Sequence, residues 1–593
     1  MNAPNDMDYA LKPSTEKTKT LAAARESLVP LLTDEKKNLT IALSCVLVSS
    51  AANLLSPVII AKVIDTAIAS QDFGSVLRYA ALLFIVYIIG AFAQFMQTIR
   101  MGTVGRGVLF KLRSQLFEKL ASLPIAFFNQ NRAGDLISRI NNDTDKINQF
   151  FSQALMQFFG NFFIILGAGI LLLSLNLKLG AVALVPAVGV FFITQLISGW
   201  VKRTSRAGLE SLGSMSGEIQ ESLANFKVIV AFNRVDYFRA KFGEANAANY
   251  RASVGSGIAS GIYTPLYTLA SSLAQLAVLG FGIWLALHGA LTIGLLVGYL
   301  LYVNSFYTPL RQLASVWSSF QLALASLDRI RDVLNMHSNL PILPAETPSN
   351  ATKGTALLAF TDVSFEYPGG KKVLHDVNLT LERGKTYALV GPTGGGKTTT
   401  ASLMARLYDP TEGTILLDGR DIRTYEQAER AKKIGFILQE PFLFTGTVRE
   451  NIGYGNTELE KLSDEEFLAV LKEANLDRLM ERFSDGLGTP TRSSGDTLSL
   501  GQKQLIAFMR AVLRKPELLI LDEATANIDT VTEELLEEIL DLLPKETTRV
   551  IIAHRLNTIA NADDIFFVNG GTLTEAGSLD HAVDMLLHGK RQS

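Results

Sequence analysis

Residues 386–398 read Thr-Tyr-Ala-Leu-Val-Gly-Pro-Thr-Gly-Gly-Gly-Lys-Thr, and this stretch decides the fold of the C-terminal half of the chain. Thr386–Val390 has the composition of a short buried strand, and a helical pattern begins at Thr399. The turn between them fits G-x-x-x-x-G-K-[ST], the pattern of a loop whose backbone N–H groups surround phosphates. Further short apolar strands alternate with helical patterns, so the sequence predicts an α/β domain built around a phosphate-binding loop.

Each residue type in this loop suits the chemistry of a nucleoside triphosphate. Glycines let backbone N–H groups approach the β-phosphate, and the N-terminus of the following helix attracts anions. Lys397 supplies a positive charge to the β- and γ-phosphates, and the Thr398 hydroxyl can bind Mg²⁺. The residues expected to contact ATP are Gly391, Pro392, Thr393, Gly394, Gly395, Gly396, Lys397, Thr398 and Thr399.

Two later strands end in polar residues that complete a hydrolytic site. Leu518–Leu521 is followed by Asp522, expected to hold Mg²⁺ through water, and by Glu523, expected to polarise the attacking water as general base. A third apolar strand ends at His554, which could contact the γ-phosphate. The alternatives are an acidic pair that stabilises a helix N-terminus and a structural histidine; we favour the catalytic interpretation because the phosphate loop is present.

The N-terminal half contains long stretches without Asp, Glu, Lys or Arg. They are Asn38–Ala61, Tyr79–Ile99, Ile147–Leu177, Leu179–Val201 and Ala252–Leu310. A helix needs about 20 mostly apolar residues to cross a membrane, so each of the first four predicts one span. The last stretch is too long for one span, and a turn at residues 288–290 would divide it into a fifth and a sixth.

Basic residues and overall composition define the topology and exclude some functions. Eight Lys or Arg residues lie between the second and third spans, eight between the fourth and fifth, and few in the other connections. The two basic connections, both termini and the ATPase domain are therefore expected on the cytoplasmic side. The net charge of −2 provides no basic field for nucleic acid. Cys45, the only cysteine, excludes a disulfide within the chain.

Four segments follow from these patterns. Residues 1–37 are expected to form a cytoplasmic N-terminal segment, in which the amphipathic Leu21–Lys37 lies along the membrane interface as an elbow helix or forms an ordinary solvated helix. Residues 38–337 would form the transmembrane domain, with helices that continue into the cytoplasm. The Pro-, Ser- and Thr-rich residues 338–354 read as a linker, and residues 355–593 as the nucleotide-binding domain.

One further motif relates the chain to a known family. Leu498-Ser499-Leu500-Gly501-Gln502 resembles the LSGGQ signature of ABC ATPases, and Phe127–Arg139 resembles the first intracellular loop of bacterial multidrug-type exporters. The resemblance implies six transmembrane helices of the type I exporter, or type IV ABC, fold joined to an α/β P-loop ATPase domain. It also implies that Tyr367 stacks on adenine, that Gln439 senses Mg²⁺, that Ser499, Gly501 and Gln502 contact the partner's ATP, that Asp529 belongs to the D-loop and that His554 is the switch histidine.

The resemblance carries a mechanism with it. Two nucleotide-binding domains would face head to tail, so that each ATP lies between the phosphate loop of one subunit and the signature of the other. Closure would drive alternating access in the membrane half. Contacts that transmit it are expected near Asn129–Asp135 and Asn233–Lys241. The implied function is ATP-driven export of a lipophilic or amphipathic small molecule, a drug or a lipid, across the cytoplasmic membrane of a bacterium.

The signature departs from the family pattern at one position. Leu500 stands where the family has glycine, and Arg492–Gly495 lacks the Glu-Arg pair common in homodimeric exporters. The hydrolytic residues Lys397, Asp522, Glu523 and His554 are all present. This combination resembles the subunit of heterodimeric bacterial exporters that keeps its Walker B glutamate. We therefore favour a heterodimer with a competent site at Glu523 and a degenerate site facing Leu500; a homodimer is the alternative.

The spans carry little information about the substrate. They contain almost no formal charge, which disfavours a charge-selective pathway. Five aromatics could line an apolar cavity, but we favour helix packing or lipid contact for most of them: Phe281, Trp284, Tyr302, Phe306 and Tyr307. The functional alternatives are an importer built on the exporter fold, for example for siderophores, and a homodimeric lipid flippase. Fused spans argue against a non-transporting ATPase, and Glu523 with His554 argues against a merely ATP-gated channel.

Overall fold

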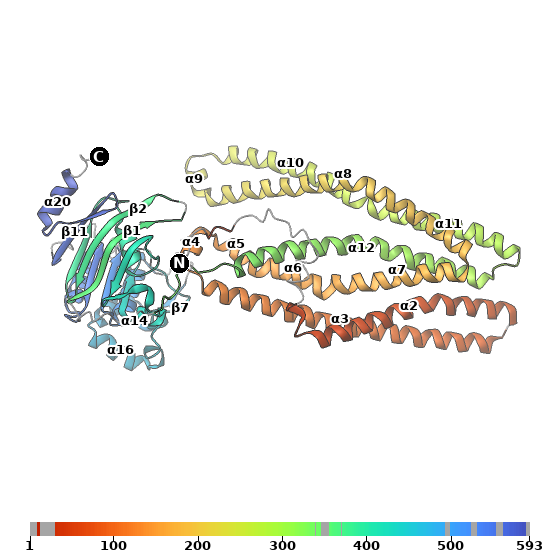
Figure 1. Ribbon diagram of the computed structural model, residues 1–593, viewed down its shortest axis with the longest axis horizontal. Helices are drawn as coiled ribbons and strands as arrows, with labels where there is room; N and C mark the ends of the chain where they lie inside the picture. The colour runs from red at the N-terminus through yellow and green to blue at the C-terminus, as the bar shows by residue number, and fades with distance from the viewer. Residues whose placement is uncertain are drawn as a thin grey trace. The chain divides into compact units, whose positions relative to one another are not determined.

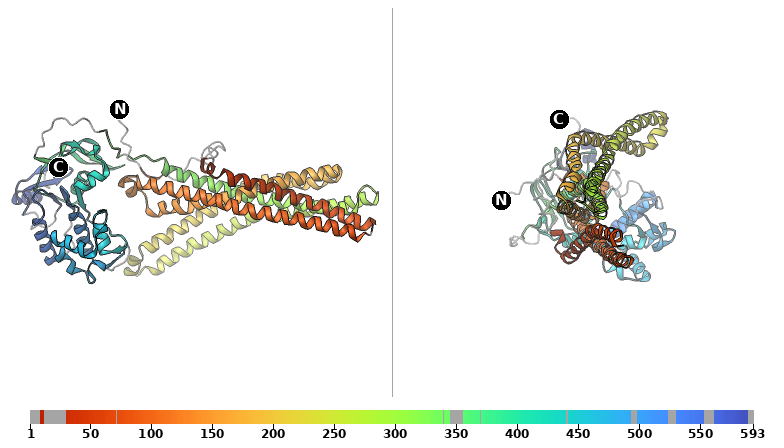
Figure 2. Two further views of the ribbon diagram at one scale, coloured as in Figure 1. Left: turned by 90° about the horizontal axis from the view of Figure 1, so that it is seen from below. Right: turned by 90° about the vertical axis from the view of Figure 1, so that its right-hand side faces the viewer.

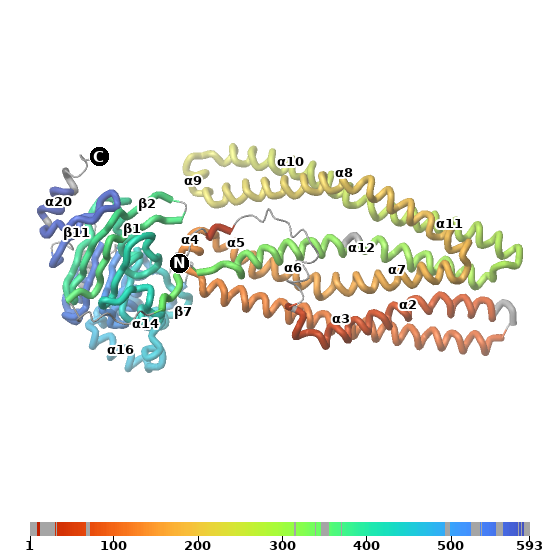
Figure 3. The backbone as a smooth tube through the Cα atoms, in the orientation of Figure 1, coloured from red at the N-terminus to blue at the C-terminus, as the bar shows by residue number. Residues whose placement is uncertain are grey.

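The computed structural model describes residues 9–11, 30–70, 72–338, 340–344, 355–368, 370–439, 441–492, 498–522, 530–552 and 561–588 (Figure 3). They fall into two compact units, which are described separately. The membrane unit lies within residues 12–120 and 134–335. The nucleotide-binding unit lies within residues 1–11, 121–133 and 336–593, so it includes a short piece of the N-terminal half.

The membrane unit is entirely helical in its described residues (Figure 1). Its helices are α2 (Lys36–Ser70), α3 (Phe73–Ala121), α5 (Ala133–Ser138), α6 (Thr144–Gln149), α7 (Leu155–Leu175), α8 (Leu177–Ala224), α9 (Phe226–Ala231), α10 (Val235–Gly261), α11 (Tyr263–Leu287) and α12 (Ile293–Leu334). Two π-helical segments, Arg139–Asp143 and Phe150–Ala154, join α5, α6 and α7 into one continuous rod. Counted in this way, the described residues contain six continuous helical segments long and apolar enough to cross a membrane, which confirms the six predicted spans.

The turn predicted inside the longest apolar stretch is confirmed. Helix α11 ends at Leu287, and Gly289 adopts a φ of +69°, a left-handed conformation that favours glycine. Helix α12 then begins at Ile293, where the Thr292 side chain accepts a hydrogen bond from the N–H of Leu295. This N-cap satisfies one of the free N–H groups of the new helix and stops the two spans from merging.

The turn between the third and fourth spans lies earlier than the charge pattern indicated. The sequence places Lys178 between the two apolar stretches, but α7 ends at Leu175 and α8 has already begun at Leu177. Asn176 separates the helices, and its side chain accepts a hydrogen bond of 3.1 Å from the N–H of Leu179. An asparagine N-cap starts a helix more effectively than one lysine can end it, because it bonds directly to the backbone.

Buried tyrosines fasten α12 to its neighbours in the membrane unit. Tyr299 and Tyr307 donate hydrogen bonds of 2.9 Å to the backbone carbonyls of Leu172 and Ala183, and Tyr302 bonds to the carbonyl of Leu54. All three tyrosines are buried, which agrees with the packing interpretation for Tyr302. Helices α8 and α10 pack side by side and diverge from the other helices toward α9 (Figures 1 and 2).

The nucleotide-binding unit is built on three sheets. A four-stranded antiparallel sheet has the order β2 (Lys372–Glu382), β1 (Ala356–Glu366), β4 (Glu412–Leu417), β5 (Arg420–Asp421). A six-stranded sheet has the order β12 (Thr572–Glu575), β11 (Asp564–Asn569), β3 (Thr386–Val390), β10 (Thr548–Ile552), β9 (Leu518–Asp522), β6 (Ile434–Ile437). In the six-stranded sheet only β12 runs antiparallel. Strands β7 (Gly446–Thr447) and β8 (Pro490–Thr491) form a small ladder.

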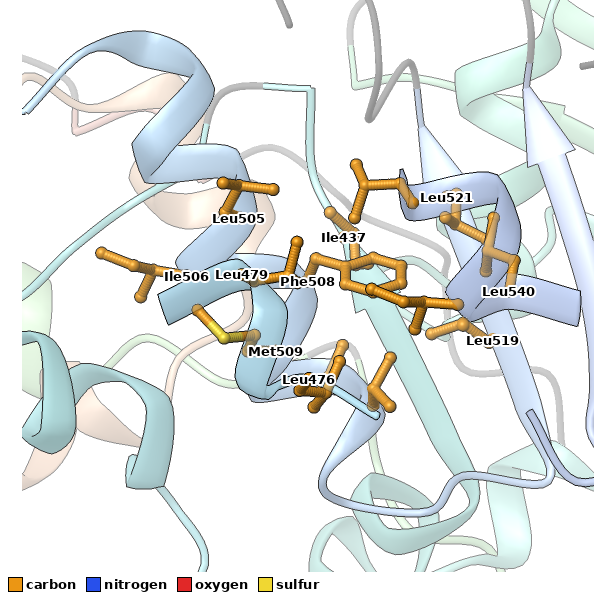
Figure 4. Packing of buried hydrophobic residues seen from close by; sticks show 14 of the residues in the cluster. Ile437, Leu476, Leu479, Leu505, Ile506, Phe508, Met509, Leu519, Leu521 and Leu540 are labelled. Carbon is orange, nitrogen blue, oxygen red and sulfur yellow. The ribbon is translucent and has the colours of Figure 1, made fainter. Parts of the chain in front are cut away.

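The helices of this unit pack against its sheets or against one another. They are α13 (Lys397–Met404), α14 (Gln427–Lys433), α15 (Val448–Gly453), α16 (Asp464–Glu473), α17 (Leu500–Val512), α18 (Thr530–Asp541) and α20 (Leu579–His588). Leu505, Phe508 and Met509 of α17 share one buried cluster with Leu519 and Leu521 of β9 (Figure 4). An α/β fold with a P-loop sheet is therefore present, as the sequence predicts.

The segments at the predicted boundaries are only partly described. The amphipathic stretch predicted over Leu21–Lys37 lies outside the described residues up to residue 29; beyond it, Pro30–Leu32 forms a 3₁₀ turn and α2 begins at Lys36. Of the predicted linker, residues 338 and 340–344 are described, with neither helix nor strand. Arg406 donates a hydrogen bond of 2.8 Å to the carbonyl of Pro341.

Candidate nucleotide-binding site

The phosphate loop connects the middle of the parallel sheet to a helix. Strand β3 ends at Val390 and α13 begins at Lys397, two residues before the predicted helix start. Gly396 has a φ of +114°, which a residue with a side chain rarely adopts. A Cβ on Gly395 would lie 2.5 Å from the carbonyl oxygen of Val568 on β11. Bare backbone is therefore required both by the turn itself and by the neighbouring strand.

Lys397 is the first residue of α13, and its side chain folds back over the loop. Its ammonium donates hydrogen bonds of 2.8 Å to the carbonyl of Gly391 and 3.1 Å to that of Pro392, and the residue is buried. A buried ammonium must be paired, and here the loop's own carbonyls provide that pairing. The lysine charge is thus held at the loop where a phosphate would bind.

The structure brings together two of the predicted metal ligands. Asp522 is the last residue of β9 and is buried, and the Thr398 hydroxyl points to its Oδ1 at 3.4 Å. A hydroxyl and one carboxylate are the ligands that Mg²⁺ uses in nucleotide sites, where phosphates and water supply the rest. The described residues include no cluster of three or more His, Cys, Asp or Glu that would form an all-protein metal site. The donors therefore fit a Mg²⁺ ion bound together with a nucleotide.

Tyr367, predicted to stack on adenine, lies beside the helix that follows the phosphate loop. Its hydroxyl is 3.1 Å from the Thr399 hydroxyl, and its ring packs edge-on against Phe365 and Tyr408, with centroids 4.8 and 5.2 Å apart. Burial raises the pKa of the Tyr408 phenol above its usual range. Tyr408 therefore stays neutral, and its ring packs against that of Tyr367. The local sequence contained no signal for this contact.

Gln439 follows strand β6 at the same edge of the sheet. Ile437, the last residue of β6, pairs with Leu521 of β9, which precedes Asp522. Gln439 is exposed, two residues beyond that pair. The topology thus places it at the carboxyl ends of the parallel strands, where ligands bind in open α/β sheets.

Three predicted residues lie outside the described residues: Glu523, Asp529 and His554. The strands that lead to two of them are described. In the register of the parallel sheet, Ile552 of β10 pairs with Asp522 of β9 on one side and with Leu389 of β3 on the other. Strand β10 therefore ends between the carboxylate and the phosphate loop, and its continuation leads to His554.

The signature motif begins helix α17 and caps it. The Ser499 side chain accepts a hydrogen bond of 3.2 Å from the N–H of Gln502, and the Gln502 side chain accepts one of 2.9 Å from the N–H of Ser499. This reciprocal capping box has a sequence signal, Ser-x-x-Gln before an apolar run, which the sequence analysis did not use. Leu500, the first residue of α17, is 44% exposed, and Gly501 follows it.

A short helix from the N-terminal half packs within the nucleotide-binding unit. It is α4 (Ile125–Gln130), and its Asn129 side chain donates a hydrogen bond of 2.8 Å to the Tyr408 hydroxyl. The Phe127 ring packs edge-on against Tyr9, and Asn131 donates to the Tyr9 carbonyl at 2.9 Å. The predicted contact region at residues 129–135 thus includes one residue bonded to a neighbour of the nucleotide site.

Comparison with known proteins identifies both halves of the chain. Residues 39–310 match the family described as ABC transporter transmembrane region, and residues 374–526 match the family described as ABC transporter. The first match covers five of the six spans and the start of the sixth. The second begins within β2 and extends past Asp522, so it includes the phosphate loop and the signature.

Several relatives match this chain over most of its length. The chain is 37% identical over 563 residues to the uncharacterized ABC transporter ATP-binding protein YfiC of Bacillus subtilis, covering 93% of this chain and 91% of that protein. It is 31% identical to a putative multidrug export ATP-binding/permease protein, YgaD, of the same species, over 93% and 95% of the two chains. It is 32% identical to a fatty acid ABC transporter ATP-binding/permease protein of Mycobacterium bovis, over 86% and 79%.

These similarities define what kind of protein the chain is. Six apolar helices make it a multi-pass membrane protein, and the ABC domain binds ATP. Its architecture is that of a half-transporter, which functions as a dimer with another ABC subunit or with itself. The chain therefore belongs to the ABC transporters of the exporter type, in which hydrolysis of ATP is coupled to transport.

Proposed function

We propose that this chain forms one half of a heterodimeric exporter that moves a lipophilic or amphipathic molecule out of a bacterial cell by alternating access. The observation that carries the proposal is the position of Lys397, Thr398 and Asp522 around one phosphate loop, in a chain with six spans. Lys397 would hold the β- and γ-phosphates, and Thr398 and Asp522 would hold a Mg²⁺ ion, which would supply charge neutralisation at the phosphates. Glu523 polarises the attacking water, and His554 contacts the γ-phosphate.

A chain of contacts supports coupling between the nucleotide site and the membrane helices. Asn129 of α4 bonds to Tyr408, Tyr408 packs against Tyr367, and the Tyr367 hydroxyl meets Thr399 of α13. A nucleotide that stacks on Tyr367 would therefore move a group in direct contact with the loop that continues from α3. Packed cores transmit such shifts because they change between discrete arrangements rather than deforming smoothly.

The second cytoplasmic tip is the short helix α9, which connects α8 to α10. The predicted contact region Asn233–Lys241 contains the exposed Val235 and Tyr237, and further exposed apolar side chains precede it, at Leu223, Phe226 and Phe232. Leu223 is 70% exposed and Phe232 is 75% exposed. Apolar groups this exposed at the end of a helical hairpin favour contact with another protein surface, which in the proposed dimer is the partner subunit's nucleotide-binding domain.

The heterodimer rests on Leu500. This side chain is exposed at the N-terminus of α17, where the family has a glycine that approaches the γ-phosphate bound by the partner. The phosphate-loop half of the same chain retains all its hydrolytic residues. We therefore assign one competent site to this chain's Glu523 and one degenerate site to the face that carries Leu500.

The decisive experiment measures transport by the complete complex. The chain would be produced together with any ABC subunit encoded by an adjacent gene, and inside-out membrane vesicles would be prepared from those cells. We expect ATP-dependent accumulation of fluorescent lipophilic compounds inside the vesicles, and loss of accumulation with Glu523→Gln. Release from preloaded vesicles, instead of accumulation, would identify an importer. Full ATPase activity of an isolated monomer would contradict the composite site.

A further inference from the structure

A polar pocket lies between helices α11 and α12 of the membrane unit. Its volume is about 270 Å³. Its walls are Tyr267, Thr268, Ser271, Ser272 and Gln275 of α11, and Asn304, Tyr307, Thr308 and Arg311 of α12. In α11 these positions recur at helical spacing, so they form one polar face on an otherwise apolar span. Polar side chains that share one face of a membrane-spanning helix and line a pocket indicate a functional site, because lipid cannot satisfy them.

Most of these polar side chains have no hydrogen-bond partner among the residues that the structure describes. Thr268 bonds to the carbonyl of Thr264, and Tyr307 bonds to that of Ala183. No side-chain hydrogen bond to any other described residue is present for five of the lining residues: Ser271, Ser272, Gln275, Asn304 and Thr308. Hydroxyl and amide groups left open on two facing helices offer donors and acceptors to a ligand.

Arg311 gives the pocket a charge. It is the first charged residue after Leu310 ends the long uncharged stretch, and among the described residues it forms no ion pair. Helix α12 begins at Ile293, so Arg311 lies about 27 Å along it at 1.5 Å per residue. The hydrocarbon core of a bilayer is about 30 Å thick, which puts the guanidinium near the far end of that core.

We propose that this pocket binds the head of an amphipathic anion, a molecule with an aliphatic chain and a carboxylate or phosphate group. Arg311 would bind the anion through paired N–H donors, and the open hydroxyl and amide groups would bond to its remaining oxygens. The inference deepens the proposed function, because it names the substrate class of the exporter. With the basic connections in the cytoplasm, the pocket opens at the depth of the inner leaflet.

The size and surroundings of the pocket agree with such a ligand. A volume of about 270 Å³ accommodates a head group and a few methylene groups, but not a complete long acyl chain. The rest of the chain has an apolar surface next to the pocket. Leu269, Leu273 and Leu276 of α11 are 58%, 49% and 67% exposed and stand on the neighbouring face of the same helix. A tail along these leucines would leave the head beside Arg311.

The test uses equilibrium binding to the complete complex in nanodiscs without nucleotide. The probes share one tail and differ in the head: oleate, oleyl alcohol, oleylamine, and lysophosphatidic acid with an oleoyl chain. We expect oleate or the lysophosphatidic acid to bind, and Arg311→Gln to weaken that binding about tenfold, the loss of a charge-assisted contact. Arg311→Lys should restore part of it. Arg251→Gln, which removes an exposed arginine of α10, is the matched control.

The outcomes separate the site from the transport function. A larger effect of Arg311→Gln on oleate than on the phosphate probe indicates a carboxylate head; the reverse indicates a phospholipid head. Equal effects of Arg311→Gln on oleate and oleyl alcohol, or tighter binding of oleylamine, would overturn the proposal. If Arg311 only contacts bilayer phosphates, Arg311→Gln should affect the binding of oleate and oleyl alcohol equally. Because binding is measured without ATP, failure of ATP-driven transport leaves this test intact.

Discussion

Two helices of the nucleotide-binding unit, α13 and α17, begin at motifs for which a phosphate contact is predicted, and they differ in the residues that precede the helix and begin it. Helix α13 is preceded by a glycine-rich loop in which a Cβ on Gly391 or Gly395 would clash with the Val568 carbonyl of β11, and its first residue, Lys397, bends back over the loop. Helix α17 is preceded by Ser499, which caps it, and its first residue, Leu500, projects into solvent.

The two N-termini differ in how closely a phosphate can approach the backbone, and not in their electrostatic attraction for it. Both helix N-termini carry the partial positive charge that favours anions. Only α13 presents bare backbone and an ammonium group, so only its phosphates can be enclosed by this chain. In the proposed dimer the α17 end serves the partner's nucleotide, and a leucine there keeps the backbone at a distance. One chain thus combines a complete half-site with an altered one, and four variants test this comparison.

Replacement of Glu523 should have the largest effect. Glu523→Gln keeps the shape of the side chain but removes the general base, so the ATPase rate of the complex should fall by about 10²-fold or more. Glu534→Gln, on an exposed position of α18, is the control and should leave the rate unchanged. Near-normal hydrolysis by Glu523→Gln would show that the phosphate-loop half is not the driving site.

A methyl group in the phosphate loop should have the next largest effect. Gly395→Ala places a Cβ 2.5 Å from a backbone oxygen of β11, which cannot move aside as a side chain could. Overpacking of this kind typically costs about 1–3 kcal/mol, so ATP affinity should fall about 10- to 100-fold. Gly488→Ala, where a Cβ meets nothing within 4 Å, is the matched control. Unchanged ATP affinity in Gly395→Ala would show that the loop tolerates a side chain as α17 does.

Loss of the α4 contact should have a smaller effect on coupling. Asn129→Ala removes the hydrogen bond to Tyr408, worth about 1 kcal/mol, and should lower substrate-stimulated ATPase about fivefold. Asn246→Ala, at an exposed position of α10, removes an equivalent side chain and should not change stimulation. If both variants respond equally to substrate, the Asn129–Tyr408 bond does not transmit the signal.

The smallest effect on the ATPase rate is expected for replacement of Leu500, the residue by which the N-terminus of α17 differs from that of α13. In the proposed heterodimer Leu500→Gly restores the signature only at the degenerate site, so the ATPase rate should stay within about twofold of the original. In a homodimer both ATP sites would face Leu500. The same change would then restore a backbone contact to the phosphate at both sites and raise the ATPase rate about tenfold. The measurement is steady-state ATPase, with the oligomer's composition determined by mass.

Several features were predictable because they depend on local patterns. Six spans follow from the length of uncharged stretches, and the phosphate loop follows from glycines between a strand and a helix. The turn between the third and fourth spans was predicted at Lys178 from the charge pattern. It lies at Asn176 instead, because the asparagine N-cap determines where α8 begins. The capping box of Ser499 and Gln502 had a recognisable signal that the ATP-contact interpretation obscured.

The sequence by itself determined which segments lie in the membrane and which in water, and the chemistry of the phosphate loop, because both depend on runs of neighbouring residues. The tertiary structure alone decided which distant groups meet: Thr398 with Asp522, Asn129 with Tyr408, and Arg311 with the polar face of α11. Such meetings depend on strand order and helix packing, which arise from the whole chain burying its apolar surface at once.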